Sequence, residues 1–420
     1  MDSWPHNRQN LMDVWYHCEI PYPHVPKDVL DAADSVRASL PNKYCDPVIA
    51  ANLFEECLDE FMLCDDEGFN VAATEHHAGI NSLLGANPML VGILSRQMKK
   101  ARILSLGTLI TLRPDVVRVA EEYATADVIS RGRLEIGFVK SGLSEMASNN
   151  ANPINNGERF WEAIDFISKA LTHQAGPFSW EGKHYTHRHV NIWPRPYQQP
   201  MPRMWAATGD PSTSAEVGRR GMVNVLVLRG PEGTRVAYAA NRKARAEAGL
   251  PKSMTDRFGY AAFVAVGDTD EEGMRVGAKL LWFLNTSLKH APQYLQFLPG
   301  TAPPEAAPGI YRTKPRPAAA GAPKAGQVAP VGANAAALMS VTPEQAMQRG
   351  ILFAGSPDSV YKQIMNFYDS VGGFGHLAMI GRTGFMTHGE TEKSIKLFGR
   401  HVLPRLQEVK PVIAGFNQKE

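Results

Sequence analysis

The fold is decided by one strand–helix–strand unit, which lies in residues 101–139: ARILSLGTLITLRPDVVRVAEEYATADVISRGRLEIGFV. Its first part, 101–112, is a continuous apolar run that predicts a buried strand, and 133–139 predicts a second strand. Between them Pro114 precedes a run over 115–130 whose apolar residues return every three or four positions, as in an amphipathic helix. Such a unit is typical of a parallel sheet that is covered by helices.

The same alternation continues along the chain. Strands are predicted at residues 11–17, 70–77, 101–112, 133–139, 202–208, 223–228, 257–267 and 375–381. Helices are predicted at 49–67, 88–100, 115–130, 157–173, 211–220, 231–248, 270–290 and 390–408, and from Ser356 and Pro357 onward. Eight strand–helix units favour an α/β fold of the (β/α)8 TIM-barrel type with insertions. An open dinucleotide-binding sheet is disfavoured because no GxGxxG stands at a strand-to-helix turn.

Two segments interrupt this rhythm. Residues 174–201 hold several aromatic residues and prolines, and they predict an irregular insertion or a small hairpin. Residues 301–338 are of low complexity and rich in Ala, Pro and Gly, a composition that cannot bury enough apolar surface to fix itself. We therefore expect 291–350 to form a Pro/Ala/Gly-rich insertion, either a mobile surface loop or a lid over the active site. The whole chain, 1–420, is expected to be a single barrel domain.

Composition limits the function. The 420 residues are 44% hydrophobic and 20% charged, which suits a globular protein and excludes wholesale disorder. Lys and Arg number 44 against 42 Asp and Glu, so the formal net charge is +2 and nucleic acid is not expected as a partner. No apolar stretch of about 18 residues predicts a membrane span, and the polar start MDSWPHNRQN is unlike a secretory signal. The four cysteines are expected to be reduced thiols in a cytoplasmic protein.

Active-site residues of a TIM barrel lie at the carboxyl ends of its strands. Applied to strands two to five, this rule selects Glu75, His76 and His77, the segment 108–111, Val139, Lys140 and Ser141, and Thr208. Neighbouring side chains on a strand point to opposite faces, so at most one of His76 and His77 faces the pocket easily.

The fifth strand ends at Thr208 and runs into GDPSTSAEVG, which predicts an anion site. Ser212 and Thr213 stand at the start of the next helix, where free N–H groups and the helix dipole both favour negative charge. Lys140 and Arg159 are the expected countercharges, and Arg159 is the better bidentate partner for phosphate. The alternative is that the hydroxyls only cap the helix and that both cations face solvent.

No metal site is expected. His184, His187 and His189 lie in the predicted hairpin without acidic neighbours at ligand spacing. The sequence contains no HExxH, Walker A or GxSxG motif, which removes the commonest zincin, NTPase and hydrolase routes.

An ordered set of segments resembles the bacterial luciferase-like, flavin-dependent monooxygenases. The segments are DEGFNVAATEHH, LGTLITLRPDVVRVAEEYATADVISRGRLEIGF, NGERFWEAIDF, MWAATGDPSTSAEVGRRG, GSPDSV and LFGRHVLPRL. They cover most of residues 50–230 and 350–408. The resemblance implies a (β/α)8 barrel that binds reduced FMN at its carboxyl-terminal mouth, usually with a separate flavin reductase.

The resemblance also implies roles for single residues. His76 matches the first histidine of the EHH motif, which is important for catalysis in luciferase-type subunits, and His77 is then structural. Lys140 falls where the family often has an arginine that reaches the FMN phosphate, and Arg159 and Thr213 match two further phosphate contacts.

Four more positions follow from the same resemblance. Thr108 and Leu109 match the strand segment under the isoalloxazine ring. Val139 replaces a cysteine of luciferase, which implies an altered pocket rather than light emission from a fatty aldehyde. Asp210 stands where luciferase has a phosphate-binding serine, and a carboxylate there would repel phosphate. The predicted cofactor-binding set is Thr108, Leu109, Val139, Lys140, Arg159, Thr208, Ser212 and Thr213.

The implied activity is that of an FMN-dependent monooxygenase. Reduced flavin and O2 would form a C4a-(hydro)peroxyflavin, from which one oxygen atom enters a small organic substrate. One alternative is an F420-dependent oxidoreductase that transfers hydride on the same barrel. Another is a non-catalytic, luciferase-like partner subunit, although such subunits tend to lack the first histidine and His76 is present. A homodimer through helices 88–100 and 115–130 is also implied, with a flavin reductase as a second partner.

Overall fold

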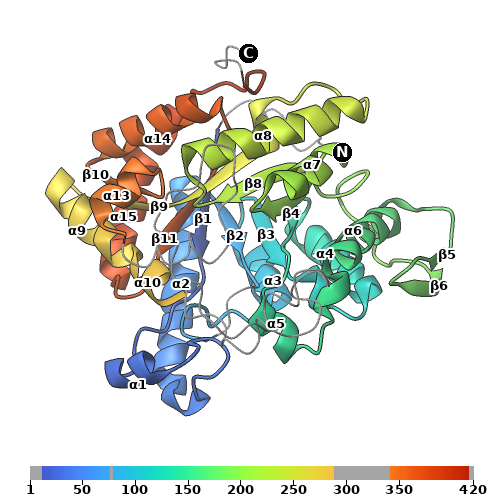
Figure 1. The fold of residues 1–420 in the computed structure, drawn as a ribbon, viewed down its shortest axis with the longest axis horizontal. Coiled ribbons are helices and arrows are strands. Elements are labelled where there is room, and N and C mark those ends of the chain that lie inside the picture. The colour runs from blue at the N-terminus through green and yellow to red at the C-terminus, as the bar shows by residue number, and fades with distance from the viewer. Residues whose placement is uncertain (1–11, 76–78, 288–340, 416–420) are drawn as a thin grey trace, which may run out of the picture.

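The structure is a computed structural model that describes residues 12–75, 79–287 and 341–415. Its centre is a closed barrel of eight parallel strands, which confirms the predicted TIM-barrel class (Figure 1). Each strand pairs in parallel with the next, and the last pairs with the first. In order around the barrel the strands are β1 (Asp13–Cys18), β2 (Asn70–Ala73), β3 (Ile103–Thr108), β4 (Leu134–Phe138), β7 (Met204–Thr208), β8 (Val223–Val227), β9 (Phe258–Val266) and β11 (His376–Arg382).

Helices follow the strands and cover the outside of the barrel (Figure 1). The long helices are α2 (Pro47–Glu67), α3 (Asn87–Gln97), α4 (Val116–Ser130), α6 (Asn156–Thr172), α7 (Pro211–Arg219), α8 (Gly230–Glu247), α9 (Asp270–Leu280), α14 (Pro357–Val371) and α15 (His388–His401). Shorter helices are α1 (Lys27–Ala32), α5 (Leu143–Ser148), α10 (Trp282–Ser287), α13 (Pro343–Gln348) and α16 (Leu403–Leu406). Single 3-10 turns are η2 (Asn42–Tyr44), η3 (Ile110–Leu112), η4 (Pro153–Asn155) and η5 (Thr255–Arg257).

Local sequence explains where these helices begin and end. The Asp46 carboxylate accepts hydrogen bonds from the first N–H groups of α2, and Asp115 does the same for α4. Helix α2 ends at Gly68, whose φ of 89° is the left-handed conformation that glycine adopts without strain. Pro357 opens α14 at its first turn, as predicted, but Ser356 makes no side-chain cap.

One strand escaped prediction. Residues 351–355 are assigned to no element from the sequence, yet β10 (Leu352–Gly355) is a parallel strand. It pairs with the second half of β9, beyond the point where β8 ends. Because β9 is nine residues long and β8 only five, the upper part of β9 would otherwise present an unpaired edge.

The two insertions differ in what the structure describes. Residues 174–201 contain the antiparallel hairpin of β5 (Phe178–Glu181) and β6 (Thr186–Val190). Residues 301–338 lie outside the described residues, so the lid interpretation stays a prediction. At the end of the predicted 291–350 insertion, residues 343–348 form helix α13. No helix in the described part of the chain has the length and apolar character needed to cross a membrane.

Aromatic rings and ion pairs close the amino-terminal end of the barrel. Trp15 and Trp205 meet edge to face with their ring centres 5.3 Å apart, and both are fully buried. Around them, Glu135 forms ion pairs with Arg102 at 2.6 Å and with Arg203 at 3.0 Å, and Arg102 also forms an ion pair with Asp13. Further along the axis several inward positions are small, among them Ala72, Gly137 and Ala261. A filled floor with small residues above it places the open end of the barrel at the carboxyl ends of the strands.

Candidate functional site

The best-defined polar contact at the carboxyl ends of the strands joins β4 to α7. Lys140 follows β4, and Thr213 lies in the first turn of α7, directly after the neighbouring strand β7. Lys140 Nζ donates to Thr213 Oγ1 over 2.9 Å. The ammonium also lies 5.7 Å from the ring centre of Phe160 and 5.8 Å from that of Trp161. Burial lowers the pKa of Lys140, while the nearby Asp210 carboxylate acts in the opposite direction.

Asp210 is the N-cap of α7. Its carboxylate accepts hydrogen bonds from the Thr213 N–H at 2.8 Å, the Thr213 hydroxyl at 2.8 Å and the Ser212 hydroxyl at 2.5 Å. Burial raises the pKa of Asp210, but these hydrogen bonds outweigh it and the pKa falls below its ordinary value. The start of α7 therefore stabilises negative charge, and a carboxylate of the chain itself provides that charge.

Arg159 lies apart from this contact. Its guanidinium carbon is 4.7 Å from the ring centre of Tyr185, in the turn between β5 and β6. The structure therefore brings Lys140, Ser212 and Thr213 together and holds Arg159 against the hairpin.

Thr208 makes buried hydrogen bonds to the elements that flank the site. Its hydroxyl lies 2.9 Å from Ser214 Oγ in α7 and donates to Asn224 Oδ1 in β8 over 2.8 Å. All three side chains are buried. Thr208 thus ties β7, α7 and β8 together and fixes where α7 begins; direct contact with a cofactor stays a prediction.

The segment predicted to lie under a flavin ring follows β3. Thr108 O accepts from Val139 N over 3.1 Å, so the ends of β3 and β4 are joined beside buried Leu109. A Cβ on Gly107 would lie 2.3 Å from the Val139 side chain, so this close approach requires glycine. The Thr108 hydroxyl accepts from Tyr123 over 2.7 Å and thus faces α4. Any contact of Thr108 with a flavin ring would therefore use its backbone.

His76 and His77 lie outside the described residues, and the structure locates only the glutamate before them. Glu75 pairs with Arg113 at 2.6 Å, at the carboxyl ends of β2 and β3. Burial raises the pKa of Glu75, although Arg113 partly offsets it. Its other oxygen, Oε2, is buried without a hydrogen-bond partner among the described residues.

The strand-end rule was applied to strands two to five and missed the first strand. His17 is the last inward-facing residue of β1, and Glu19 follows it; His17 Nε2 and Glu19 Oε1 are 3.3 Å apart. The polar residues at the end of the apolar run 11–17 were the signal that could have found them.

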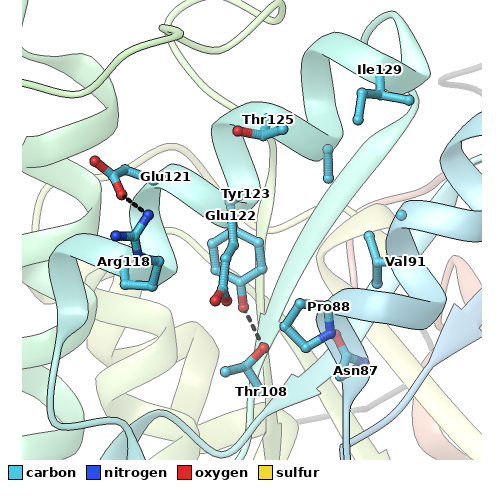
Figure 2. A pocket seen from close by; sticks show the side chains of 12 residues that line it. Asn87, Pro88, Val91, Thr108, Arg118, Glu121, Glu122, Tyr123, Thr125 and Ile129 are labelled. Atoms are coloured by element: carbon cyan, nitrogen blue, oxygen red, sulfur yellow. Dashed lines mark hydrogen bonds and ion pairs between the residues drawn. The ribbon is translucent and has the colours of Figure 1, made fainter.

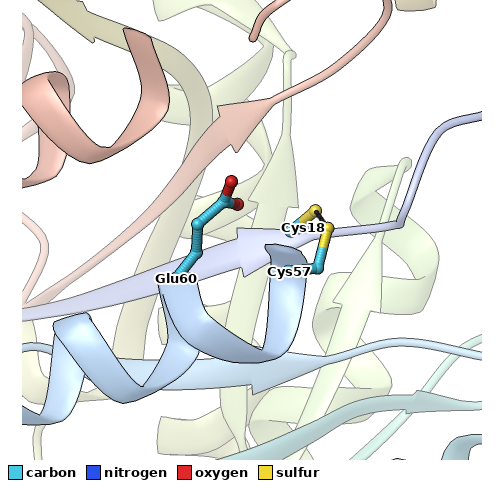
Figure 3. A group of neighbouring side chains, drawn as sticks. All are labelled: Cys18, Cys57 and Glu60. Atoms are coloured by element: carbon cyan, nitrogen blue, oxygen red, sulfur yellow. Dashed lines mark hydrogen bonds between the residues drawn. The ribbon is translucent and has the colours of Figure 1, made fainter. Parts of the chain in front are cut away.

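Among the described residues, one group brings three metal-binding side chains together: Cys18, Cys57 and Glu60 (Figure 3). The two sulfurs face each other at 3.4 Å, while Glu60 already accepts hydrogen bonds from Tyr16 at 2.9 Å and Arg382 at 2.5 Å. The hydrogen bond with the Cys18 thiol, together with burial, raises the pKa of Cys57 well above its ordinary value. A cysteine held as the neutral thiol, beside a carboxylate that is already engaged by Arg382, is a packing arrangement rather than a cation site.

A hollow of about 250 Å³ lies on the outer surface between α3 and α4 (Figure 2). Pro88, Val91 and Ile129 line it, and the Tyr123–Thr108 hydrogen bond lies at its base. Apolar side chains stand exposed on both helices: Met89 (71%), Ile93 (39%), Val128 (39%) and Ile129 (45%).

Comparison with known proteins identifies the family. The family model described as luciferase-like monooxygenase matches residues 46–373. The chain belongs to the luciferase-like monooxygenase family. This confirms the resemblance carried by its sequence motifs.

Individual relatives match over shorter stretches. The oxygenase component of flavin-dependent trigonelline monooxygenase from Acinetobacter baylyi is 28% identical over 38% of this chain and 45% of its own. The alkanal monooxygenase beta chain of Vibrio harveyi is 37% identical over 29% of this chain and 37% of its own. The matched region thus spans less than half the length of either relative.

Solved structures extend the likeness over almost the whole fold. The oxygenating constituent of 3,6-diketocamphane monooxygenase from Pseudomonas putida, solved with FMN, has a TM-score of 0.65 at 15% identity and covers 94% of this chain and 98% of its own. An F420-dependent secondary alcohol dehydrogenase has a TM-score of 0.61 at 13% identity and covers 84% and 94%. At these identities the likeness shows the fold alone.

The residues at the start of α7 fit the phosphate of a flavin mononucleotide. Lys140 offers a cation, and Ser212 and Thr213 offer hydroxyl donors. The lowered pKa of Asp210 shows that these same donors stabilise an anion. A phosphate bound here would compete with the Asp210 carboxylate for them.

Proposed function

We propose that this chain is an FMN-dependent monooxygenase that inserts one oxygen atom into a small organic substrate. The observation that supports this most is the Lys140–Thr213 contact at the anion-stabilising start of α7. It lies at the carboxyl ends of two neighbouring strands, where TIM barrels place their active sites. Family membership adds that one relative is the oxygenase component of a flavin-dependent monooxygenase.

Within this proposal each part of the mouth has a task. Lys140, Ser212 and Thr213 hold the phosphate, and Arg159 turns from Tyr185 to become its second cation. The joined ends of β3 and β4, with Leu109 and Val139, support the flavin ring. The bound flavin supplies the electrons that activate O2, and the barrel wall keeps water from the reacting atoms.

His76 is proposed as the catalytic residue, as a hydrogen-bond partner or proton donor beside the flavin. The His76→Ala variant should fold and bind FMN but release hydrogen peroxide in place of oxygenated product. Peroxide yield per O2 consumed, compared with wild type, measures this. Unchanged coupling would remove His76 from the mechanism.

The second candidate is F420-dependent hydride transfer, and Asp210 is the observation that favours it. A carboxylate beside the anion site tolerates the singly charged phosphodiester of F420 better than a doubly charged phosphate monoester. Anaerobic titration with reduced FMN and with reduced F420 separates the candidates. Tighter binding of F420, with no O2 consumption by the flavin-loaded protein, would replace the monooxygenase proposal.

A third candidate, a non-catalytic partner subunit, is raised by the alkanal monooxygenase beta chains among the relatives. The sequence speaks against it because His76 is present. Product formation by the purified chain with reduced FMN alone would exclude this role.

Two partners complete the proposal. A separate reductase delivers reduced FMN, and the chain forms a homodimer through α3 and α4. The exposed apolar residues Met89 and Ile93, beside the hollow between these helices, suit burial against a second copy. A Met89→Glu variant should shift the mass measured by light scattering from dimer to monomer, whereas Val236→Glu, exposed on α8, should not.

A further inference from the structure

The first strand brings a histidine and a glutamate to the mouth of the barrel. Trp15 points into the barrel, where it meets Trp205. Side chains two positions apart on a strand share a face, so His17 points the same way, one layer nearer the carboxyl end. The residues level with His17 are Ala72 in β2 and Ile380 in β11.

One carboxylate oxygen of Glu19 has a hydrogen-bond partner, and the other has none among the described residues. Oε1 lies 3.3 Å from His17 Nε2, and the two side chains are only 12% and 13% exposed. Oε2 is buried and meets no hydrogen-bond donor among the described residues. Leaving such an oxygen unpaired is unfavourable, because no hydrogen bond offsets the loss of its water. Buried groups of this kind are uncommon in folded proteins and call for an explanation such as an incoming ligand.

The surroundings of Glu19 are acidic. Arg37 interacts electrostatically with both Glu19 and Glu145, so the described cluster contains two carboxylates and one guanidinium. Arg37 Nε also lies 3.5 Å from Asn81, whose amide donates to Thr286 in α10 over 2.9 Å. These groups come from separate segments that meet at the end of the barrel flanked by α5 and α10 (Figure 1).

We propose that Glu19 selects substrates that carry a protonated amine, and that His17 is the residue that positions it. This rests on the proposed monooxygenase function and adds a substrate class to it. An ammonium group supplies an N–H donor for Oε2, which meets none among the described residues, and it adds a second positive charge to a cluster of two carboxylates and one guanidinium. A neutral hydroxyl supplies the donor without the charge, and a carboxylate supplies neither.

Three ligands of equal size test the proposal on the FMN-bound protein at pH 7: benzylamine, which is protonated, benzyl alcohol and benzoate. Isothermal titration should give a dissociation constant for benzylamine at least tenfold lower than for benzyl alcohol, with no measurable benzoate binding. The Glu19→Gln variant keeps the shape of the side chain and should weaken benzylamine at least tenfold while leaving benzyl alcohol unchanged. The matched control is Asp28→Asn, an exposed carboxylate on α1, which should alter neither constant.

His17 is tested by rescue. His17→Ala should weaken benzylamine binding, and His17→Gln, which keeps a donor toward Glu19, should recover most of it. A purely space-filling role would not distinguish these variants by the charge of the ligand. Equal affinity of wild type for benzylamine and benzyl alcohol would overturn the proposal, as would a Glu19→Gln variant that binds benzylamine like wild type. Failure of wild type to bind FMN would instead overturn the proposed function, since FMN binding is measured first.

Discussion

The two ends of this barrel treat charged side chains in opposite ways. At the amino-terminal end, Glu135 shares its two oxygens among Arg102, Arg203 and Trp205. At the carboxyl-terminal end, Glu19 and Glu75 each keep one buried oxygen without a partner among the described residues. Both arrangements belong to one barrel, so the difference reflects the task of each end rather than the fold. One end is saturated and stable, and the other holds unused hydrogen-bonding capacity for a ligand.

Charge balance shows the same contrast. Burial alone would raise the pKa values of Asp13 and Glu135. Arg102 and His376 outweigh burial at Asp13, Arg203 and Arg102 outweigh it at Glu135, and both pKa values are lowered. At the other end, burial lowers the pKa of Lys140 and the Asp210 carboxylate only partly offsets it. A group whose charged form is incompletely compensated gains most from a new partner of opposite charge.

The largest expected effect is on stability, and it comes from breaking the ion-pair network around Glu135 at the amino-terminal end. Glu135→Gln removes the buried carboxylate that the half-buried Arg102 and Arg203 share, and loss of one partner of a buried ion pair costs up to about 3–5 kcal/mol. Urea unfolding should show this loss in the free energy of unfolding, while FMN affinity stays at the wild-type value.

The matched control for Glu135 is Glu181, which pairs with Arg188 on the exposed hairpin at 3.0 Å. Glu181→Gln should change the unfolding free energy by no more than the error of the measurement, because solvent screens that pair. If the two variants lost equal stability, the amino-terminal network would have no special role.

The next largest effect concerns the other end. Lys140→Ala should leave the unfolding free energy nearly unchanged, since Lys140 is only half-buried and its charge is poorly compensated. FMN affinity should fall about tenfold to a hundredfold, which corresponds to roughly 1.5–3 kcal/mol for a hydrogen bond to a charged group. Riboflavin, which lacks the phosphate, is the control ligand and should bind as before. An equal loss for both ligands would place Lys140 at the ring rather than at the phosphate.

Two histidines make the stability of the fold depend on pH, in opposite directions. His376, beside Trp15 and Trp205, is fully buried, and burial lowers its pKa below 6.5. His376 therefore binds a proton near pH 6.5 in the unfolded chain but not in the folded chain. The free energy of unfolding falls as the pH drops below that value. The slope from His376 is at most about 1.4 kcal/mol per pH unit. Urea unfolding between pH 5 and pH 8 should give a flatter curve for His376→Gln than for wild type.

His388 has the opposite effect on how stability depends on pH. A hydrogen bond to Glu60 at 3.0 Å raises its pKa, so its contribution to stability is present below pH 6.5 and is lost as the pH rises through the raised value. The contribution is small because the side chain is partly solvated. His388→Gln should therefore remove a slight fall in stability above pH 6.5 and leave the slope of the acid limb unchanged. Curves of equal slope for all three proteins would show that neither histidine governs the acid response.

The fold could be predicted because its strands are buried on both sides and read as unbroken apolar runs. β10 was missed because a run as short as LFAG has no pattern of its own; only the excess length of β9 gives it a partner. The contact between Lys140 and Thr213 could be anticipated because neighbouring strand ends meet. The place of Arg159 could not, because it depends on packing against Tyr185 in a distant hairpin.

The smallest expected effect separates the two roles of Asp210. As a cap it donates nothing and only accepts, so Asn at this position keeps the hydrogen bond to the Thr213 N–H and preserves α7. As a negative charge it opposes a phosphate, so Asp210→Asn should raise FMN affinity severalfold, a change of about 1 kcal/mol. Riboflavin affinity should not change, and FMN and riboflavin titrations of both proteins measure the difference. If FMN bound more weakly to the variant, the carboxylate would be assisting the cofactor, and the anion would have to lie elsewhere than at the start of α7.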